Sequence, residues 1–435
     1  LLSDLFAGAI PAIAVCKDAL MVIVFASFFA RYLRRRWRVN ATLYLFLGFA
    51  ALSALYVPLA PDWMRATLQL RCLTLYPLIS LLVANLIETP QDLRRMLRLI
   101  AVVGVMTVVY GLAQYLTMFD VSYRIAGGAV TQRMGRFEGF GVVSTFASRP
   151  SFGGYLIPLF LLLLQVKLWP STKIYLKIWW TLRWLALSSS AVCLILTYSR
   201  TIWIATLVGL FVILYLRDKM KAVLMALALG ACLLIAYQAK SFFLSSSMEE
   251  AVTSGESFQA RLSYWPRVLG YVLANPLGIG LGTVGGPHLF ESRAQADTYG
   301  NLSYDPQTMF DSTGGLNADN MLAVTDNSYL KLLIQGGFPL LFVFLWLVAS
   351  VLKLASNTLS GLGAQGRNPA LASFDSWIRD VAIWASASFA SLLTIFMFVD
   401  FFEAAPSISI YWLAVGALCC VRKMAQDQVA GRMKR

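Results

Sequence analysis

Two arginines stand at positions where a charged side chain could bind phosphate. Arg200 ends the short segment 198–200 between two apolar stretches, and Arg261 precedes Trp265 in the longest polar segment of the chain. A guanidinium group presents a planar fork of N–H donors that binds two phosphate oxygens at once. Both arginines are therefore candidate phosphate-binding residues. The same positions also suit an arginine that reaches lipid headgroups and an arginine that stacks on Trp265.

A carboxylate marks the end of the same polar segment. Asp326 is the last residue before the chain becomes apolar again, in the sequence Asp326-Asn327-Ser328-Tyr329-Leu330. A carboxylate at the mouth of a membrane cavity is a candidate general base. An aspartate followed by Asn and Ser is also a good helix N-cap. The residue pattern leaves both interpretations open.

Further polar and aromatic side chains stand close to these three in the sequence or interrupt apolar stretches. Charged residues inside membrane spans usually face a cavity or a partner, although those near a span end also reach the interface. An aromatic side chain beside Arg261 could pack against a lipid tail or a sugar ring. The candidate substrate-binding residues are Arg71, Arg136, Trp265, Asn327, Tyr329 and Lys331.

The sequence contains no recognisable metal or nucleotide motif. The only histidine, His288, has no partner motif, so we do not expect it to be the base. The glycine-rich run 275–286 lacks the Gly-Lys-Ser/Thr ending of a P-loop and predicts a turn. Four loop aspartates at 297, 305, 311 and 319 lack the spacing of a calcium-binding loop. We therefore expect neither a metal nor a cofactor.

The composition excludes an ordinary soluble protein. Hydrophobic residues make up 58% of the chain and charged residues only 13%, with a mean hydropathy of +0.68. Soluble domains carry about 25% charged residues. The composition predicts an all-α polytopic membrane protein. The apolar stretches and the charge pattern predict about 11–12 transmembrane helices and a large, partly helical periplasmic loop. In such a protein the net charge of +14 serves topology first, so no nucleic-acid partner is expected.

Eleven apolar stretches are long enough to be membrane spans. Basic residues are concentrated in every second connection, which the positive-inside rule makes cytoplasmic. This arrangement puts Leu1 outside, and we expect one further span upstream of it. Residues 1–239 would then hold spans one to eight, 240–326 the large periplasmic loop, and 327–435 the last three spans with a cytoplasmic tail. The predicted spans are 5–30, 41–58, 66–87, 97–117, 152–168, 182–197, 201–216, 222–239, 329–352, 378–399 and 407–421.

Part of the large loop has helical periodicity. Aromatic and aliphatic residues recur at near-helical spacing over 257–274, which predicts an amphipathic helix on the membrane surface. The segment Asn275-Pro276 stops it, and three glycines follow.

Several short motifs occur in a particular order along this topology. Taken together they resemble the O-antigen ligase/polymerase family of bacterial inner-membrane proteins, and the resemblance covers most of the chain. The motifs are Ser144-Thr145-Phe146 to Gly154-Tyr155-Leu156, Leu196-Thr197-Tyr198-Ser199-Arg200, Arg261 to Trp265, Asn275-Pro276-Leu277-Gly278-Ile279-Gly280-Leu281-Gly282, and Asp326-Asn327-Ser328-Tyr329-Leu330 followed by Gly336-Gly337.

The resemblance implies a metal-independent, inverting glycosyltransferase of the C-type membrane architecture. Its donor would be a glycan linked to undecaprenyl pyrophosphate, and its acceptor a hydroxyl of a glycan or of lipid A–core on the periplasmic side. Membrane lipid and a chain-length regulator are further implied partners. Arg200 and Arg261 would bind the pyrophosphate and stabilise it as it leaves.

One residue departs from the pattern of the ligases in this family. Those that attach O-antigen to lipid A–core usually have His before Asn where this chain has Asp326, and that His is the proposed base. A carboxylate can do the same work. The departure favours the polymerase branch, with an O-antigen ligase as the alternative.

Two other classes fit the sequence less well. A transporter would require inverted repeats and charges at mid-bilayer, and no clear internal repeat is present. A membrane scaffold would not need arginines gathered at one face.

Overall fold

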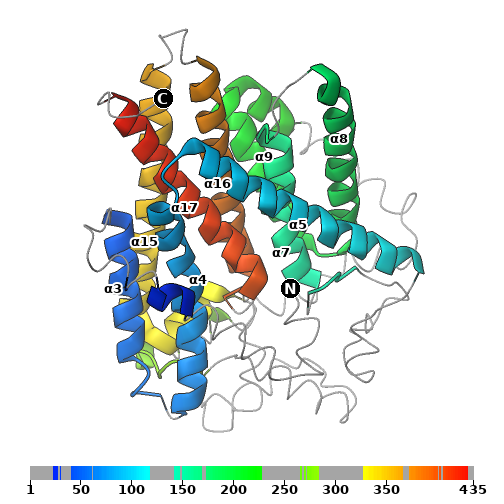
Figure 1. Ribbon diagram of the computed structural model, residues 1–435. Helices are drawn as coiled ribbons and strands as arrows, with labels where there is room; N and C mark the ends of the chain where they lie inside the picture. Colours follow the sequence, from blue (N-terminus) through cyan, green and yellow to red (C-terminus); the bar gives the residue numbers. More distant parts are fainter. Residues whose placement is uncertain are drawn as a thin grey trace.

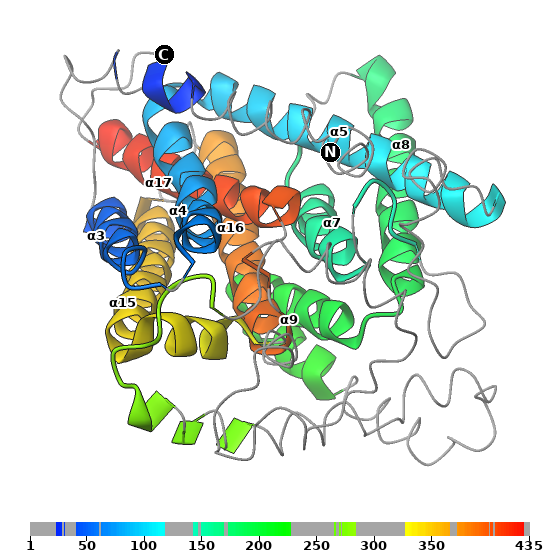
Figure 2. The ribbon, with the colours of Figure 1, turned by 90° about the horizontal axis from the view of Figure 1, so that it is seen from below.

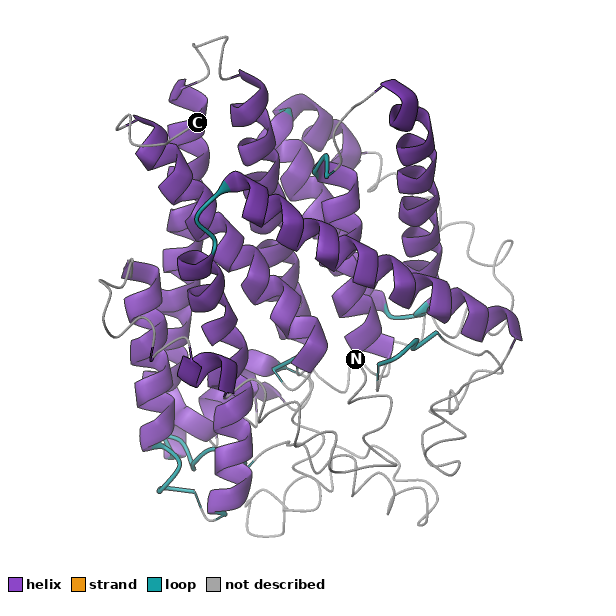
Figure 3. Ribbon diagram, in the orientation of Figure 1, coloured by secondary structure: helices purple, strands orange, loops and turns teal. Residues whose placement is uncertain are grey.

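The computed structural model describes residues 23–27, 30, 41–60, 62–117, 142–146, 149–168, 173–227, 265–266, 269–270, 272–283, 327–365, 372–399, 401–402 and 405–429. Within these residues the chain forms helices, turns and irregular segments, and no strand (Figure 3). The principal helices, in chain order, are α3 Ala41–Leu55, α4 Trp63–Leu86, α5 Pro90–Thr117, α7 Arg149–Gln165, α8 Lys173–Leu196, α9 Arg200–Arg217, α15 Ser328–Gln365, α16 Ala372–Phe398 and α17 Ala405–Val429 (Figure 1).

The predicted fold class is confirmed. Among the described residues, six helices are long and apolar enough to cross a membrane, namely α4, α5, α9, α15, α16 and α17. Shorter apolar helices occupy Thr42–Leu55 and Trp180–Leu196. The protein is therefore an all-α polytopic membrane protein. The predicted spans 5–30 and 222–239 lie largely outside the described residues, so the number of eleven spans stays a prediction.

Most of these helices begin earlier than their apolar stretches predicted, and the starts of α4 and α5 show why. Helix α4 starts at Trp63 rather than residue 66, because the Asp62 side chain accepts hydrogen bonds from the N–H groups of Met64 and Arg65. Helix α5 starts at Pro90 rather than residue 97. There, Thr89 Oγ1 accepts from the Asp92 N–H, and a proline suits the first helical position. Hydropathy located the apolar centre of each helix, whereas polar caps fix its ends.

Helix α7 lies at the centre of the bundle, surrounded by α5, α8, α9, α16 and α17 (Figure 2). Every residue from Phe152 to Leu159 is buried. Neighbouring segments approach α7 closely at glycines, since Ile202 of α9 packs directly on Gly153 and Phe401, between α16 and α17, packs on Gly154. Close backbone approach at small residues is how membrane helices gain van der Waals contact.

The end of the bundle where α9 finishes is held by a shared carboxylate. Asp380 Oδ1 accepts a hydrogen bond from Gln165 Nε2 of α7 and forms an ion pair with Arg217 Nη2 of α9, each at 2.9 Å. Arg183 of α8 donates from Nε to the Leu163 carbonyl at 2.6 Å. Four helices are thus joined at one end, which is the end that the charge pattern predicts to face the cytoplasm.

Candidate functional site

The opposite end of the bundle brings together the starts of α7, α9, α15 and α17. Ser407 Oγ, near the start of α17, donates to the Ser151 carbonyl near the start of α7 at 2.5 Å. Ser328 Oγ, at the start of α15, donates to the Val399 carbonyl and accepts from the Phe401 N–H. These bonds join residues that lie 71 to 256 positions apart, so the arrangement is purely tertiary.

Arg200 is the first residue of α9, in the position that the sequence predicted. Helix α8 ends at Leu196, and Ser199 is the N-cap residue of α9. The Trp203 indole donates to the Leu194 carbonyl at 3.0 Å and so fastens the two helices across the turn. The Arg200 side chain is exposed.

Helix geometry places Arg200 at the same end as the start of α15. Helix α9 runs antiparallel to α16, because Arg217 pairs with Asp380 at one end and Gly209 lies against Ser391 further along. Arg200 lies about 25 Å along α9 from Arg217, and Met397 lies about 25 Å along α16 from Asp380. Arg200 therefore reaches the level of Met397.

Asn327 connects that level to the start of α15. Its Oδ1 accepts from the N–H groups of Tyr329 and Leu330 at 2.9 and 3.0 Å, and its Nδ2 donates to the Met397 carbonyl at 2.9 Å. Asn327 is thus the N-cap of α15. The capping role considered for Asp326 belongs to its neighbour.

Tyr329 and Lys331 lie inside the bundle. The Tyr329 hydroxyl donates to the Leu393 carbonyl at 3.2 Å, and its ring packs between Phe344 and Phe396. Lys331 is completely buried. A charged side chain this deep in a membrane protein marks a functional site or a buried charge partner. Substrate binding by Asn327, Tyr329 and Lys331 stays a prediction.

The glycine run that predicted a turn is docked into a break in α15. Gly337 has φ +62°, which interrupts the helix, and Pro339 has no N–H to donate to the Gln335 carbonyl. The loop supplies the missing partners. Ile279 N–H donates to the Ile334 carbonyl and Gly280 N–H to the Gln335 carbonyl, each at 3.0 Å.

A third hydrogen bond runs in the opposite direction, because the Phe338 N–H at the break donates to the Pro276 carbonyl of the loop at 3.0 Å. The loop glycines at 278, 280 and 282 all have positive φ. A side chain at Gly280 would meet the backbone of Ala60, and one at Gly282 would meet Arg65 and Ala66 at the start of α4. The loop therefore fills the space between α4 and the break in α15.

Two candidates on other elements are only partly enclosed. Arg71 is the ninth residue of α4 and half-buried. Gln69 on the same helix is 1% exposed, and neither of its amide atoms has a hydrogen-bond partner among the described residues. Trp265 is helical and half-buried, and the predicted surface helix over 257–274, which lies largely outside the described residues, stays a prediction.

Three predicted site residues, Asp326, Arg261 and Arg136, lie outside the described residues. Their convergence with Arg200 stays a prediction. His288 and the four loop aspartates also lie outside. In the part of the chain that the structure describes, no three histidine, cysteine, aspartate or glutamate side chains gather as metal ligands would.

Arg149 is a residue that the sequence reasoning did not select. It is the half-buried first residue of α7, one turn before Gly153. Gly153 packs against Ile202, which is two residues after Arg200. Arg149 and Arg200, each the first residue of its helix, therefore both lie near the contact between Gly153 and Ile202. The only sequence signal of Arg149 was an arginine directly before an apolar stretch.

Tyr198 adds a hydroxyl beside Arg200. Its φ of +48° turns the chain between α8 and α9. Burial raises the pKa of the Tyr198 phenol, and Tyr115 raises it further by charge repulsion and a side-chain hydrogen bond. The phenol is therefore protonated at neutral pH, and it can donate a hydrogen bond but cannot act as a base.

Part of this arrangement lies within a segment that matches a family model. Residues 185–345 match the model of the O-antigen ligase family. No curated protein matches the chain. The match covers the turn at Arg200, the docked glycine loop and the break in α15. It supports the O-antigen ligase/polymerase family for this chain and glycan transfer in a membrane as its kind of reaction.

Proposed function

We propose that the protein is a polysaccharide polymerase of the bacterial inner membrane whose site faces the periplasm. It transfers a glycan from undecaprenyl pyrophosphate to a sugar hydroxyl of a second lipid-linked unit. The observation that carries the proposal is the family match over residues 185–345, which includes both the Arg200 turn and the start of α15.

The reaction needs a base, an open face of the donor sugar and a stabilised leaving group. The acceptor oxygen attacks the anomeric carbon as its proton passes to the Asp326 carboxylate. The bond from that carbon to the pyrophosphate oxygen breaks, and the pyrophosphate leaves with the electron pair. Inversion at the anomeric carbon follows from attack opposite the leaving group.

Arginines supply the stabilisation of the leaving group. Arg200 and Arg261 bind the pyrophosphate, and Arg149, which is near Arg200 through Gly153 and Ile202, extends the set. Fixed cations aimed at charge that develops in the transition state lower the barrier without reorganising. We assign Trp265, Arg71, Arg136, Tyr329 and Lys331 to substrate binding, and Asn327, which follows Asp326 in the sequence, caps α15. No metal takes part.

The capping geometry supports the role of Asp326. Asn327 already accepts from the two N–H groups at the start of α15. A cap is therefore not the reason for a carboxylate at residue 326. With helix capping assigned to Asn327, the hypothesis that Asp326 is the general base has one fewer competing explanation.

The test is polymer length after substitution, in cells where this chain is the only polymerase. We expect Arg200→Ala and Asp326→Asn each to lower activity at least 100-fold, as loss of one transition-state contact does. Arg149→Ala should lower activity about tenfold. Lys219→Ala, an exposed cation beyond the opposite end of α9, is the matched control and should leave polymer length unchanged. Normal polymer from Arg200→Ala would remove the site assignment.

An O-antigen ligase remains the second candidate, because the matching family model carries that description. The two differ in acceptor. Purified protein given the lipid-linked donor alone forms longer lipid-linked glycan if it is a polymerase. Product that appears only when lipid A–core is added would make it a ligase.

A further inference from the structure

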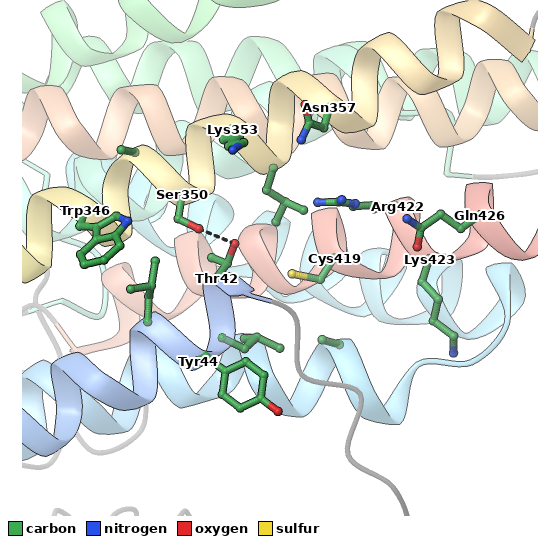
Figure 4. A pocket seen from close by; sticks show the side chains of 15 residues that line it. Thr42, Tyr44, Trp346, Ser350, Lys353, Asn357, Cys419, Arg422, Lys423 and Gln426 are labelled. Carbon is green, nitrogen blue, oxygen red and sulfur yellow. Dashed lines mark hydrogen bonds between the residues drawn. The ribbon is translucent and has the colours of Figure 1, made fainter.

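A cavity of about 890 Å³ lies at the end of the bundle opposite Arg200. Its walls come from the start of α3, the second half of α15 and the last turns of α17 (Figure 4). This volume is typical of small-molecule sites. None of the residues considered above for glycan transfer lines it.

One part of the cavity is strongly basic. Lys353 of α15 and Arg422 and Lys423 of α17 line it, and no acidic residue does among the described ones. Figure 4 shows Arg422 extending from α17 into the space below α15. Lys423 points away from Lys353 and α15, so the cations around this space are Lys353 and Arg422 (Figure 4). Like charges at the edge of a low-dielectric region attract an anion.

The other part of the cavity is apolar and open. Trp346 is 56% exposed and Tyr44 63% exposed, although both belong to apolar helices. Between these parts, Thr42 Oγ1 and Ser350 Oγ lie 2.8 Å apart and hydrogen-bond to each other (Figure 4). The other polar side chains of the lining are the three cations and the amides of Asn357 and Gln426.

The apolar surface continues along α15. Phe342 is 64% exposed and stacks edge to face on Trp346, with ring centroids 6.1 Å apart. From Lys353 to Phe342 is about 16 Å along the helix, and the hydrocarbon core of a bilayer is about 30 Å thick. The track from the cations to Phe342 therefore has the length of one leaflet.

We propose that this cavity binds one anionic phospholipid of the leaflet that the charge pattern predicts to be cytoplasmic. Lys353 and Arg422 hold the headgroup phosphate, and Lys423, which points away from them, adds to the positive charge at this face (Figure 4). One acyl chain lies along Trp346 and Phe342. A basic pocket between helices at this face is suited to an anionic headgroup.

The chemistry of the walls separates this ligand from its alternatives. A free phosphate would gain nothing from Trp346 and Phe342. A zwitterionic phospholipid would bring an ammonium group to a wall where no described acidic residue could pair with it. Only a lipid with net negative charge uses both parts of the cavity.

The test measures lipid binding to the purified full-length chain by native mass spectrometry. Phosphatidylglycerol and phosphatidylethanolamine with identical acyl chains are titrated separately. We expect phosphatidylglycerol to bind more tightly to the native chain. The triple variant Lys353→Gln, Arg422→Gln, Lys423→Gln should weaken phosphatidylglycerol binding about tenfold or more, since each cation near the surface contributes to attraction.

A matched triple removes three cations outside the cavity. Arg95, Lys219 and Lys221 are exposed, and each is replaced by glutamine in the control. The control should bind phosphatidylglycerol within twofold of the native chain. Arg422→Gln alone, expected to weaken binding about threefold, serves if the first triple does not purify as a folded protein.

Three results would overturn the proposal. Equal loss of phosphatidylglycerol from both triples would mean a general charge effect. Equal binding of the two lipids to the native chain would mean that the cations do not select an anionic headgroup over a zwitterionic one. Displacement of phosphatidylglycerol by glycerol phosphate at the same concentration would make this a free phosphate site.

Discussion

Helices α7 and α15 each contain a proline inside an apolar stretch. Each proline leaves one carbonyl without its helical N–H donor, and the two helices obtain a replacement donor from different groups. Pro158 removes the N–H that would bond the Gly154 carbonyl, and Pro339 does the same to the Gln335 carbonyl. In α7 the Tyr411 hydroxyl donates to the Gly154 carbonyl at 2.7 Å. The helix continues without a break.

In α15 the replacement comes from a backbone instead of a side chain. The Gly280 N–H donates to the Gln335 carbonyl, and Gly337 leaves helical geometry. An unsatisfied carbonyl inside a membrane protein costs several kcal/mol, so each gap must be filled. In α7 a hydroxyl supplies one hydrogen bond to the backbone. In α15 the loop makes three hydrogen bonds with the backbone, and the helix is interrupted at Gly337 to make room for it. The first solution stabilises the core, and the second brings the loop after α9 into contact with the start of α15.

The largest effect should come from closing the opening in α15. In Gly337→Ala, a side chain would occupy the left-handed region and contact the Pro276 carbonyl. We expect loss of about 3 kcal/mol of stability from strain and steric conflict together. The measurement is the melting temperature of the purified chain in detergent.

Gly361→Ala on the same helix is the matched control. No atom lies within 4 Å of the position that its Cβ would occupy. It should raise stability slightly or leave it unchanged, because alanine favours helix over glycine. Equal destabilisation by both variants would refute a special role for Gly337.

Removing the hydroxyl that repairs α7 should have a smaller effect. Tyr411→Phe leaves the buried Gly154 carbonyl without that donor, at a cost of about 1–3 kcal/mol. The melting temperature should fall, while Tyr44→Phe, at an exposed phenol, should not change it. An unchanged melting temperature for Tyr411→Phe would mean that the gap in α7 needs no donor.

The proline itself offers a test of the repair. Pro158→Ala restores an N–H that can bond the Gly154 carbonyl. Combined with Tyr411→Phe, it should recover about 1 kcal/mol of the loss, as a double-mutant cycle of thermal unfolding would reveal. Simple addition of the two single effects would contradict the hydrogen-bond explanation.

The smallest effect is expected for Pro339→Ala in α15. The Gln335 carbonyl is already bonded to Gly280, and Gly337 keeps the helix open whether or not residue 339 has an N–H. Stability should change by less than about 0.5 kcal/mol, within the range of ordinary substitutions. A rise comparable to the recovery in α7 would mean that the two breaks are equivalent after all.

Local patterns in the sequence predicted much of this molecule. Apolar stretches located the helices, and an arginine between two of them placed Arg200 at the start of α9. Caps were harder, because Asp326 and Asn327 both suit that role and only the observed N–H contacts assign it to Asn327. Neighbouring residues of similar chemistry are not distinguished by pattern alone.

What the sequence could not predict depends on distant partners. The glycine run indicated a turn, but no residue next to it in the sequence indicates that the Gly280 N–H bonds to the Gln335 carbonyl of α15. The break in α15 was also missed, because apolar composition continues through Gly337. Arg149 became a candidate only because the structure shows Gly153 of the same helix packed against Ile202, two residues after Arg200. Tertiary contacts of this kind have no local signal.

The repair of α7 has a consequence for the order of events during synthesis. The two groups that bond its backbone beside Pro158, the Trp384 indole and the Tyr411 hydroxyl, lie 226 and 257 residues from their acceptors along the chain. At about 5–20 residues per second, the ribosome makes them roughly 10–50 s after α7. For that time the Gly154 carbonyl of α7 lacks its tyrosine donor, and Gly154 lacks the cover of Phe401. Another partner, such as water or the insertion machinery, must satisfy that carbonyl until α17 arrives.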